Sequence, residues 1–126
     1  MMLPAILIIV VVFIIAEVLF PFFRYIVPRF YLVMGDSMYP TLAEGDVVMG
    51  LKPRPTQLLE NGGIYGYQLP LDEKKWVIKR LIYQTGDKCF FLGDNSNNSI
   101  DSRDYGLVDR SKIMFEVVWY KDMRGR

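Results

Sequence analysis

The chain has 126 residues, of which 15 are Lys or Arg and 14 are Asp or Glu, so its net charge is +1. This balance excludes the strongly basic surface that nucleic-acid binding proteins present. The composition includes no histidine and one cysteine, which excludes an internal disulfide and a zinc site of the usual ligand types.

The first predicted element is a membrane anchor at residues 1–27. Within residues 1–23, Glu17 is the only charged side chain. About 20 apolar residues that rise ~1.5 Å each are enough to cross the hydrocarbon core of a bilayer. A cleavable signal peptide is a weaker interpretation, because no basic segment precedes the apolar run and no small-x-small cleavage site follows it. A buried helix is also weaker, because the remaining chain is too short to cover a helix that is apolar on every side.

Basic and aromatic side chains follow the apolar run, which is typical of a membrane interface. The basic residues are Arg24 and Arg29, and aromatic residues occupy positions 20, 22, 23, 25, 30 and 31. We therefore expect the lipid bilayer to be one partner of this chain. The positive-inside rule, applied to these two arginines, predicts that the following domain lies on the cytoplasmic side.

Residues 28–126 are predicted to form one mainly β domain, a compact β-barrel or sandwich, because short apolar runs alternate with turn residues. Residues 70–75 are expected to be a polar connection, residues 93–106 a polar loop, and residues 121–126 a frayed tail. The predicted strands are 30–34, 46–51, 64–69, 75–84, 88–92 and 113–120.

Ser37 is the first candidate for chemistry. It lies between Gly35, which allows close backbone approach, and Pro40, which stiffens the far side of the turn. Taken alone, a serine in such a turn is more often a turn residue than a nucleophile. If Ser37 is a nucleophile, its base must be a lysine, a carboxylate or a metal hydroxide, because the chain has no histidine.

Lys79 is the candidate base. Alternate side chains of a strand share a face, so Lys79 is expected to lie beside Val77, Leu81 and Tyr83. Burial among apolar neighbours disfavours the ammonium form and lowers the pKa of a lysine from about 10.4. An amine that titrates nearer neutrality can serve as a general base. The alternative is a strand lysine whose amine stays in water, which is the commoner arrangement.

The third candidate is the polar loop at residues 93–106. Its carboxylates and Arg103 can interlock through charge-assisted hydrogen bonds, and such a loop can orient a lysine amine. The alternatives are a solvated loop or a loose cation site formed by Asp94, Asn98 and Asp101. No EF-hand spacing is present, and we expect neither a metal nor a cofactor.

Three segments, in this order after an apolar N-terminal run, resemble the type I signal peptidase family of membrane-bound serine–lysine proteases. They are GDSMYPTLAEGDVV from residue 35, VIKRLI from residue 77 and GDNSNNSIDSRDYG from residue 93. The resemblance covers residues 33–120 and implies a β-rich endopeptidase that cleaves N-terminal signal peptides from exported precursors. It also implies a domain on the extracytoplasmic face. Larger bacterial members insert a second β-domain between residues that match 80 and 93, so this chain resembles a minimal catalytic core.

The resemblance also implies roles for individual residues. Ser37 matches the nucleophile, Lys79 the general base, and the Ser37 backbone N–H an oxyanion donor. Gly35 stands where some members supply a second donor from a hydroxyl group, and Ser99 matches the serine that orients the lysine amine. The other matching residues are the ion pair of Asp101 and Arg103, the motif positions Asp94 and Arg80, and the neighbours of the nucleophile, Met38 and Pro40.

Three other functions remain open. Small members of the same family include dedicated peptidases that remove one propeptide from one substrate. A catalytically inactive, membrane-tethered β-domain that binds partners is disfavoured by the ordered presence of Ser37, Lys79 and Ser99. A self-cleaving regulator is disfavoured by the anchor and by the lack of a DNA-binding region. Precursor proteins with signal peptides or propeptides are the expected partners, and the oligomeric state is not predicted.

Overall fold

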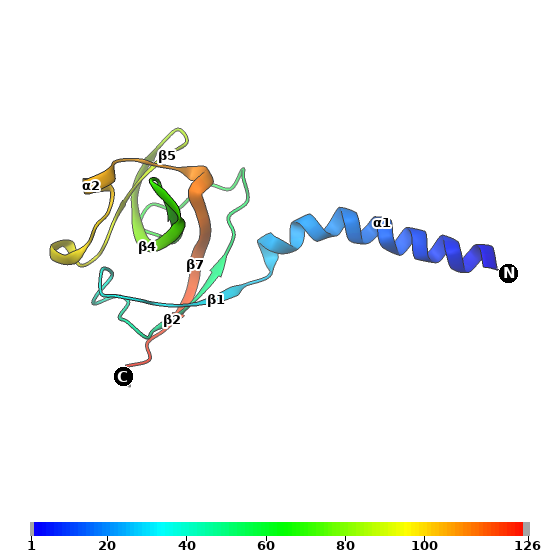
Figure 1. Cartoon of the computed structure of the whole chain (residues 1–126), viewed down its shortest axis with the longest axis horizontal. Helices are drawn as coiled ribbons and strands as arrows, with labels where there is room; N and C mark the ends of the chain where they lie inside the picture. Colours follow the sequence, from blue (N-terminus) through cyan, green and yellow to red (C-terminus); the bar gives the residue numbers. More distant parts are fainter. Residues whose placement is uncertain (1, 125–126) are drawn as a thin grey trace.

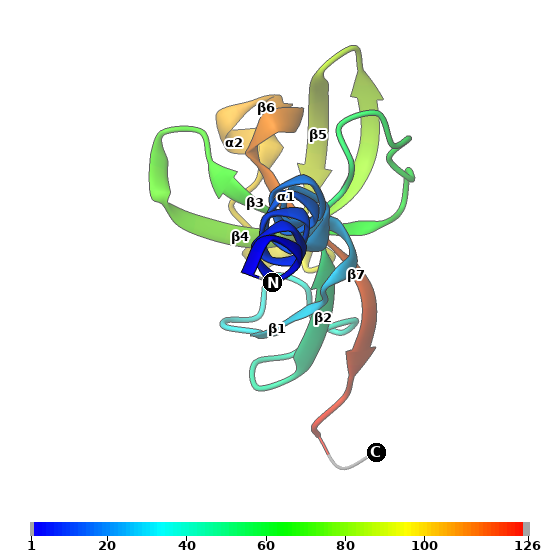
Figure 2. The same ribbon diagram turned by 90° about the vertical axis from the view of Figure 1, so that its right-hand side faces the viewer.

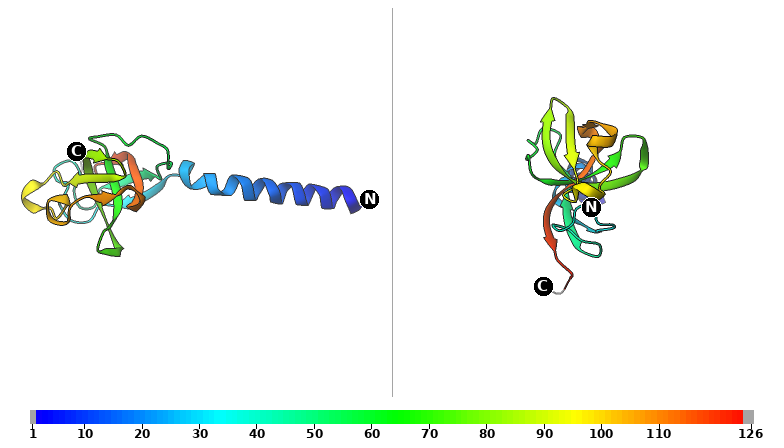
Figure 3. Two further views of the ribbon diagram at one scale, coloured as in Figure 1. Left: turned by 90° about the horizontal axis from the view of Figure 1, so that it is seen from above. Right: turned by 90° about the vertical axis from the view of Figure 1, so that its left-hand side faces the viewer.

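The computed structural model describes residues 2–124, as one long helix followed by a β-sheet domain (Figure 1). Helix α1 (Met2–Ile26) projects away from the domain, and none of its residues is buried (Figure 3). Its mean hydropathy reaches 3.0 over an 18-residue window, so it is long and apolar enough to cross a membrane. The predicted apolar N-terminal helix is therefore present.

The domain contains one seven-stranded antiparallel sheet, which confirms the prediction of a mainly β fold. The strand order is β1-β2-β7-β3-β4-β5-β6, so β7 returns from the end of the chain to lie between β2 and β3. Figure 2, which looks along α1, shows the strands arranged behind the helix. The strands are β1 (Arg29–Leu32), β2 (Val47–Leu51), β3 (Ile64–Leu69), β4 (Asp72–Thr85), β5 (Lys88–Leu92), β6 (Val108–Asp109) and β7 (Ile113–Lys121).

Strand β4 begins earlier than predicted. The polar connection expected at residues 70–75 is instead the tip of a hairpin, in which Leu69 pairs with Asp72. The side chains of residues 73–76 are exposed, because the hairpin extends beyond the core. Polar side chains do not prevent pairing there, since antiparallel strands bond through their backbones and can face water.

The predicted alternation along β4 holds from Val77 to Leu81 and then fails at Tyr83. Leu81 is buried in one apolar cluster and Val77 packs against it, with Lys79 between them in sequence. The pairing of β4 with β5 shifts between Leu81 and Tyr83. Such an irregularity reverses the alternation of side chains, so Tyr83 is exposed and stacks on Phe90 at the surface.

The loop predicted at residues 93–106 contains two short helices, η1 (Ser96–Asn98) and α2 (Ser102–Tyr105). Helix α2 is nucleated by a capping box, because the carboxylate of Asp101 accepts the Arg103 N–H and the carboxylate of Asp104 accepts the Asp101 N–H. The last short helix, η2 (Arg110–Lys112), precedes β7.

The sheet is buried on both faces by two apolar clusters. The first packs Tyr67 against Phe91, with ring centroids 4.2 Å apart. The second joins β-strand residues such as Ile78 and Phe115 to Met38 and Leu42 of the turn that contains Ser37. This second cluster fixes the turn against β4, and thereby places Ser37 beside Lys79.

Candidate active site

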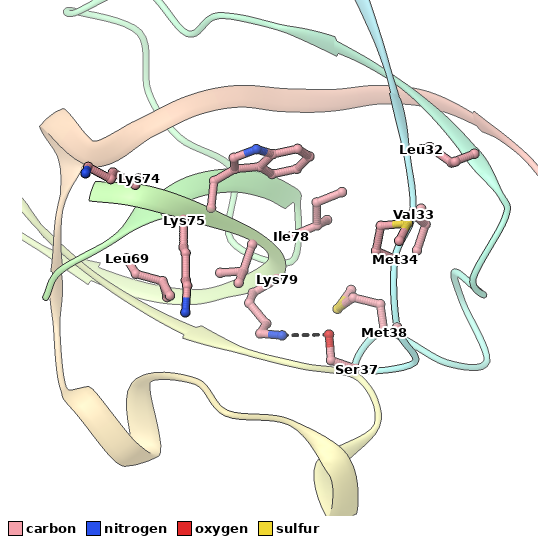
Figure 4. A pocket seen from close by; sticks show the side chains of 13 residues that line it. Leu32, Val33, Met34, Ser37, Met38, Leu69, Lys74, Lys75, Ile78 and Lys79 are labelled. Carbon is pink, nitrogen blue, oxygen red and sulfur yellow. Dashed lines mark hydrogen bonds between the residues drawn. The ribbon is translucent and has the colours of Figure 1, made fainter. Parts of the chain in front are cut away.

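Ser37 and Lys79 are in direct contact. The Nζ atom of Lys79 lies 2.6 Å from the Oγ atom of Ser37, and the dashed line in Figure 4 marks this interaction. Lys79 is only 3% exposed, whereas Ser37 is half-buried. When the amine is neutral, the Ser37 hydroxyl can donate its proton to the Lys79 nitrogen along this contact.

The environment of Lys79 favours the neutral amine. Burial lowers the pKa of Lys79, and the negative charge of Asp101 opposes part of that shift by raising it. The net direction is downward from 10.5. Because a lower pKa leaves more of the lysine unprotonated at physiological pH, the group is suited to accept a proton.

Asp101 holds the loop beside this pair. Its fully buried carboxylate accepts hydrogen bonds from the Ser99 hydroxyl at 2.7 Å and the Gly93 N–H at 3.0 Å, and it forms an ion pair with Arg103 at 2.9 Å. Burial raises the pKa of Asp101, but the hydrogen bonds from Arg103, Gly93 and Ser99 outweigh it, so the net pKa is well below the usual range. Asp101 is therefore a stable negative charge near Lys79.

Ser99 donates its hydrogen bond to Asp101. The resemblance implies that Ser99 orients the lysine amine, and within residues 2–124 its hydroxyl is bonded to the Asp101 carboxylate. The effect of Ser99 on Lys79 in this structure therefore passes through the position of that carboxylate.

Gly93 is a residue of the site that the sequence reasoning did not single out. A Cβ atom built on Gly93 would lie 2.1 Å from the Ser99 Oγ atom and 2.6 Å from the Ser37 carbonyl oxygen. No side chain fits at this point, because the backbone segments that carry Ser99 and Ser37 both contact Gly93. The Gly-Asp dipeptide at the end of β5 was visible in the sequence, but its close approach depends on the tertiary contact.

The loop after β5 is bonded along the turn that contains Ser37. The Asn95 N–H donates to the Ser37 carbonyl at 2.9 Å, and the Asn95 and Asn98 amides donate to the backbone and side chain of Asp36 at 3.1 and 2.6 Å. The Thr41 hydroxyl donates to Asp94 at 2.6 Å. These bonds explain how an exposed, polar loop can hold the turn that contains Ser37 in one position.

Arg80 and Asp94 anchor this loop to β4. The Arg80 guanidinium donates to both carboxylate oxygens of Asp94, at 2.8 and 2.7 Å, in the bidentate geometry that favours such pairs. Hydrogen bonding from Arg80 lowers the pKa of Asp94 and that from Asp94 raises the pKa of Arg80. Arg80 directly follows Lys79 in β4, so the pair joins the strand of the lysine to the loop of Ser99.

A cavity of about 450 Å³ opens in front of Ser37 and Lys79. Its walls are mainly apolar and come from β1, the turn that contains Ser37 and the first half of β4 (Figure 4). Lys74 and Lys75 lie at the end of the cavity formed by the β3–β4 hairpin. The lining residues are Leu32, Val33, Met34, Gly35, Ser37, Met38, Leu69, Lys74, Lys75, Trp76, Val77, Ile78 and Lys79.

Gly35 adopts a φ of +76°, a conformation that favours glycine. Its N–H donates to the Glu44 carboxylate at 3.3 Å. The Ser37 N–H makes no hydrogen bond within the described residues, so it can donate to a group that enters the cavity.

The part of the chain that the structure describes contains no group of three or more His, Cys, Asp or Glu residues that could hold a metal ion. The three residues considered for a loose cation site have other partners. Asp94 binds Arg80, Asn98 binds Asp36, and Asp101 binds Arg103.

The segment expected to be a frayed tail instead contacts the turn that contains Ser37, through Arg124. Residues 125–126 lie outside the described residues. Arg124 forms an ion pair with the fully buried Asp46 at 3.4 Å, donates to the Pro40 carbonyl at 3.2 Å, and lies over the ring of Tyr39. The Met123 N–H also donates to Asp46. The prediction was wrong because Asp46 and Arg124 are far apart in the sequence, so no local pattern shows their contact.

Comparisons with known proteins identify the family of this chain. The chain matches the family model described as signal peptidase, peptidase S26, over residues 3–89, a range that includes Ser37 and Lys79. It is 29% identical over 113 residues to mitochondrial inner membrane protease subunit 1 of Mus musculus, covering 70% of this chain and 68% of the relative. The same subunit of Homo sapiens is 32% identical over 108 residues, covering 66% of this chain and 65% of the relative.

Proposed function

Since this chain belongs to the signal peptidase family, peptidase S26, we propose that Ser37 and Lys79 form the catalytic dyad with which it cleaves precursor proteins. Family membership makes the chain a membrane-associated protease. The observation that carries the dyad is the 2.6 Å contact between the Ser37 hydroxyl and the amine of Lys79, which is 3% exposed.

In the proposed reaction, the Ser37 Oγ atom attacks the carbonyl carbon of the scissile peptide bond while the neutral amine of Lys79 accepts the hydroxyl proton. The C–N bond then breaks, and the Lys79 ammonium gives that proton to the leaving amine. A water molecule, deprotonated by the same lysine, attacks the acyl-enzyme ester and releases the new carboxyl terminus and the Ser37 hydroxyl. No cofactor is required in this scheme.

The developing oxyanion is stabilised by the Ser37 backbone N–H, which has no internal partner among the described residues. Gly35 has no hydroxyl to add, so a second donor in this region would have to be a backbone group. Ser99 and Asp101 are positioning residues, because they act on Lys79 through the loop and through charge. Arg103, Asp94 and Arg80 hold that loop in place.

The proposed substrate is an extended precursor peptide that lies in the apolar cavity along β1 and β4. By resemblance to the family, small residues such as alanine are expected at the first and third positions before the cleavage site. Residues 1–27 are proposed to be the anchor and residues 28–126 the catalytic domain. We propose the extracytoplasmic face for this domain, as the resemblance to the family implies. The two arginines after the anchor are only a small bias in the opposite direction.

The proposal is tested by a cleavage assay with the full chain in detergent or liposomes. The substrate is a precursor peptide with alanine at the first and third positions before the cleavage site. Ser37→Ala and Lys79→Met are each expected to lower kcat/KM by about 10³-fold or more, as loss of a nucleophile or its base does in comparable enzymes. Ser111→Ala and Lys88→Met are the matched controls, because both residues lie outside the cavity.

Retention of cleavage in either dyad variant would contradict the proposed chemistry. A wild-type chain that binds the precursor without cleaving it would instead support the inactive, partner-binding alternative. Because both dyad variants keep the pocket walls, binding of the precursor by these variants separates loss of chemistry from loss of folding.

A further inference from the structure

Four basic side chains gather where α1 meets the sheet domain. Arg24 lies in the last turn of α1, Arg29 begins β1, and Lys52 and Arg54 follow β2. Because Arg29 pairs with Gly50 across the β1–β2 ladder, the register brings Lys52 to the same end of the hairpin as Arg29. We call Arg24, Arg29 and Lys52 the junction cluster, because Arg54 does not line the cavity that these three share.

Three of these side chains line one cavity. Arg24, Arg29 and Lys52 surround a space of about 300 Å³, whose remaining walls come from Val27, β1, β2 and β7. No acidic residue lines this cavity. Three cations that face a shared space repel one another unless an anion enters it, so the cavity is suited to a negatively charged group.

The cluster forms no ion pair within the described residues, although Lys52 also lines a neighbouring cavity with Glu116. Within residues 2–124, none of the ion pairs involves Arg24, Arg29, Lys52 or Arg54. The guanidinium of Arg24 donates to the hydroxyl of its neighbour Tyr25 and lies over that ring, which leaves its charge uncompensated. By contrast, Arg80, Arg103 and Arg124 each bind a carboxylate.

A second cavity continues from the first along the helix. It has a volume of about 470 Å³ and shares Arg24, Val27 and Arg29 with the first cavity. Its other walls are apolar and belong to the last turns of α1, at Phe20, Pro21 and Phe23. A cationic space that opens into an apolar one along a membrane helix is complementary to a molecule with an anionic head and an apolar chain.

We propose that the junction cluster binds the phosphate of an anionic phospholipid, with an acyl chain in the adjoining cavity against α1. The helix has 25 residues, so at ~1.5 Å per residue it can cross the hydrocarbon core and bring its last turn to the depth of the phosphate groups. Basic side chains at that depth are attracted to anionic lipid. The apolar cavity favours a lipid over a free phosphate ion, which has no chain to fill it.

The experiment is native mass spectrometry of the detergent-solubilised full chain, titrated with phosphatidylglycerol, phosphatidylcholine or inorganic phosphate. The test variant is Arg29→Gln/Lys52→Gln, and the charge-matched control is Lys88→Gln/Lys121→Gln, which removes two cations away from the cavity. We expect the wild type and the control to retain phosphatidylglycerol in preference to phosphatidylcholine. The test variant is expected to bind it roughly 10- to 30-fold more weakly, from the attraction that two basic side chains contribute.

The outcomes separate the possible ligands. Equal affinities of the test variant and the control, or equal retention of the two lipids, would overturn the proposal. Competition by millimolar inorganic phosphate as effective as that by phosphatidylglycerol would identify a phosphate site rather than a lipid site. Arg29→Lys/Lys52→Arg keeps both charges, so retained binding by this variant would support the electrostatic basis. The measurement does not involve proteolysis, so it succeeds or fails independently of the proposed dyad.

Discussion

Burial lowers the pKa of the Lys79 amine, and the nearby charge of Asp101 opposes that shift. Asp101 therefore affects the protonation of Lys79, and its own carboxylate is held by Ser99, Gly93 and Arg103. The balance between burial and this single charge decides what fraction of Lys79 is neutral at a given pH.

The first prediction concerns the pH dependence of cleavage. The neutral amine is the proposed base, so kcat/KM should fall as the pH drops through the pKa of Lys79, which lies below 10.5. Asp101→Asn removes the charge that raises this pKa. The acidic limb of the plot of kcat/KM against pH should therefore move to lower pH. The same substitution should also cost about 1–3 kcal/mol of stability, because it weakens the buried hydrogen bonds.

The control for this measurement is Asp109→Asn, which removes an acid that is not among the causes of the Lys79 shift. Its acidic limb should coincide with that of the wild type. An unchanged limb in Asp101→Asn, or a limb at higher pH, would show that Asp101 does not act on the base through its charge.

The second prediction is that Lys79→Met raises the stability of the protein while abolishing cleavage. Below the native pKa the lysine is protonated in both states, and the folded state carries the cost of burying the charge. Between the lowered native pKa and the unfolded value near 10.5, the unfolded chain binds more protons, so the wild type gains stability as the pH rises. Methionine removes the cost of burying the charge. The gain in the free energy of unfolding of Lys79→Met over the wild type should therefore be largest at low pH and shrink toward pH 10.5.

Urea unfolding of both proteins from pH 6 to pH 10 measures this difference. Lys88→Met is the control, since the Lys88 side chain is half-exposed and paired with Asp109. A Lys79→Met protein that is less stable than the wild type at every pH would mean that the buried amine contributes more through packing than it costs through burial.

The third prediction is that Gly93→Ala displaces both Ser37 and Ser99. The new methyl group would overlap Ser99 and the Ser37 carbonyl, and the backbone would have to move by a substantial fraction of an ångström. Misplacement of reacting groups by about 1 Å costs about 10²-fold in rate, and overpacking costs roughly 1–3 kcal/mol. We therefore expect both losses in this variant.

Gly63→Ala distinguishes the two effects. A Cβ atom on Gly63 would lie 3.0 Å from the Glu60 carbonyl oxygen and 3.0 Å from the Tyr65 ring, so this variant is also overpacked, but not against Ser37, Ser99 or the cluster that holds the Ser37 turn. It should lose stability and keep most of its kcat/KM at temperatures where it is folded. Equal loss of activity in both glycine variants would show that general strain, rather than displacement of the site, causes the effect.

The fourth prediction concerns Arg124, which donates a hydrogen bond to the Pro40 carbonyl in the turn that contains Ser37. Arg124→Ala leaves the fully buried carboxylate of Asp46 with only backbone donors, so we expect a loss of about 1–3 kcal/mol of stability. We also expect kcat to fall by about tenfold with little change in KM, because the turn that carries Ser37 loses one of its supports. Lys121→Ala is the control, as Lys121 is exposed on the same terminal segment.

Much of the sheet was predictable, because its strands are short apolar runs separated by turn residues. The hairpin of β4 and β5 is the clearest example, since its tight turn at Gly86 requires a positive φ that the sequence supplies. The start of β4 was not predictable from apolar pattern, because residues 72–75 are polar and pair only through their backbones. The reversal at Tyr83 depends on a register shift that no local pattern encodes.

The residues of the candidate site were predicted from the order of three sequence motifs, rather than from the secondary-structure propensity of any one segment. The contact between Ser37 and Lys79 joins residues 42 positions apart, and each alone had an ordinary interpretation. The capping box of Asp101 and Asp104 could have been recognised from spacing, and it would have predicted helix α2. The close approach at Gly93 and the support from Arg124 could not, because both depend on segments that meet only in the folded chain.

Only Val27 and Pro28 separate the end of α1 from the start of β1. With the helix in a bilayer, so short a tether gives the domain almost no freedom to rise, and Ser37 is held at a nearly constant height above the lipid. Under the proposed mechanism, a precursor that is itself fixed in the membrane would have to present its scissile bond at that height. The proposed cleavage site would then be selected by its distance from the membrane as well as by the side chains that fit the cavity.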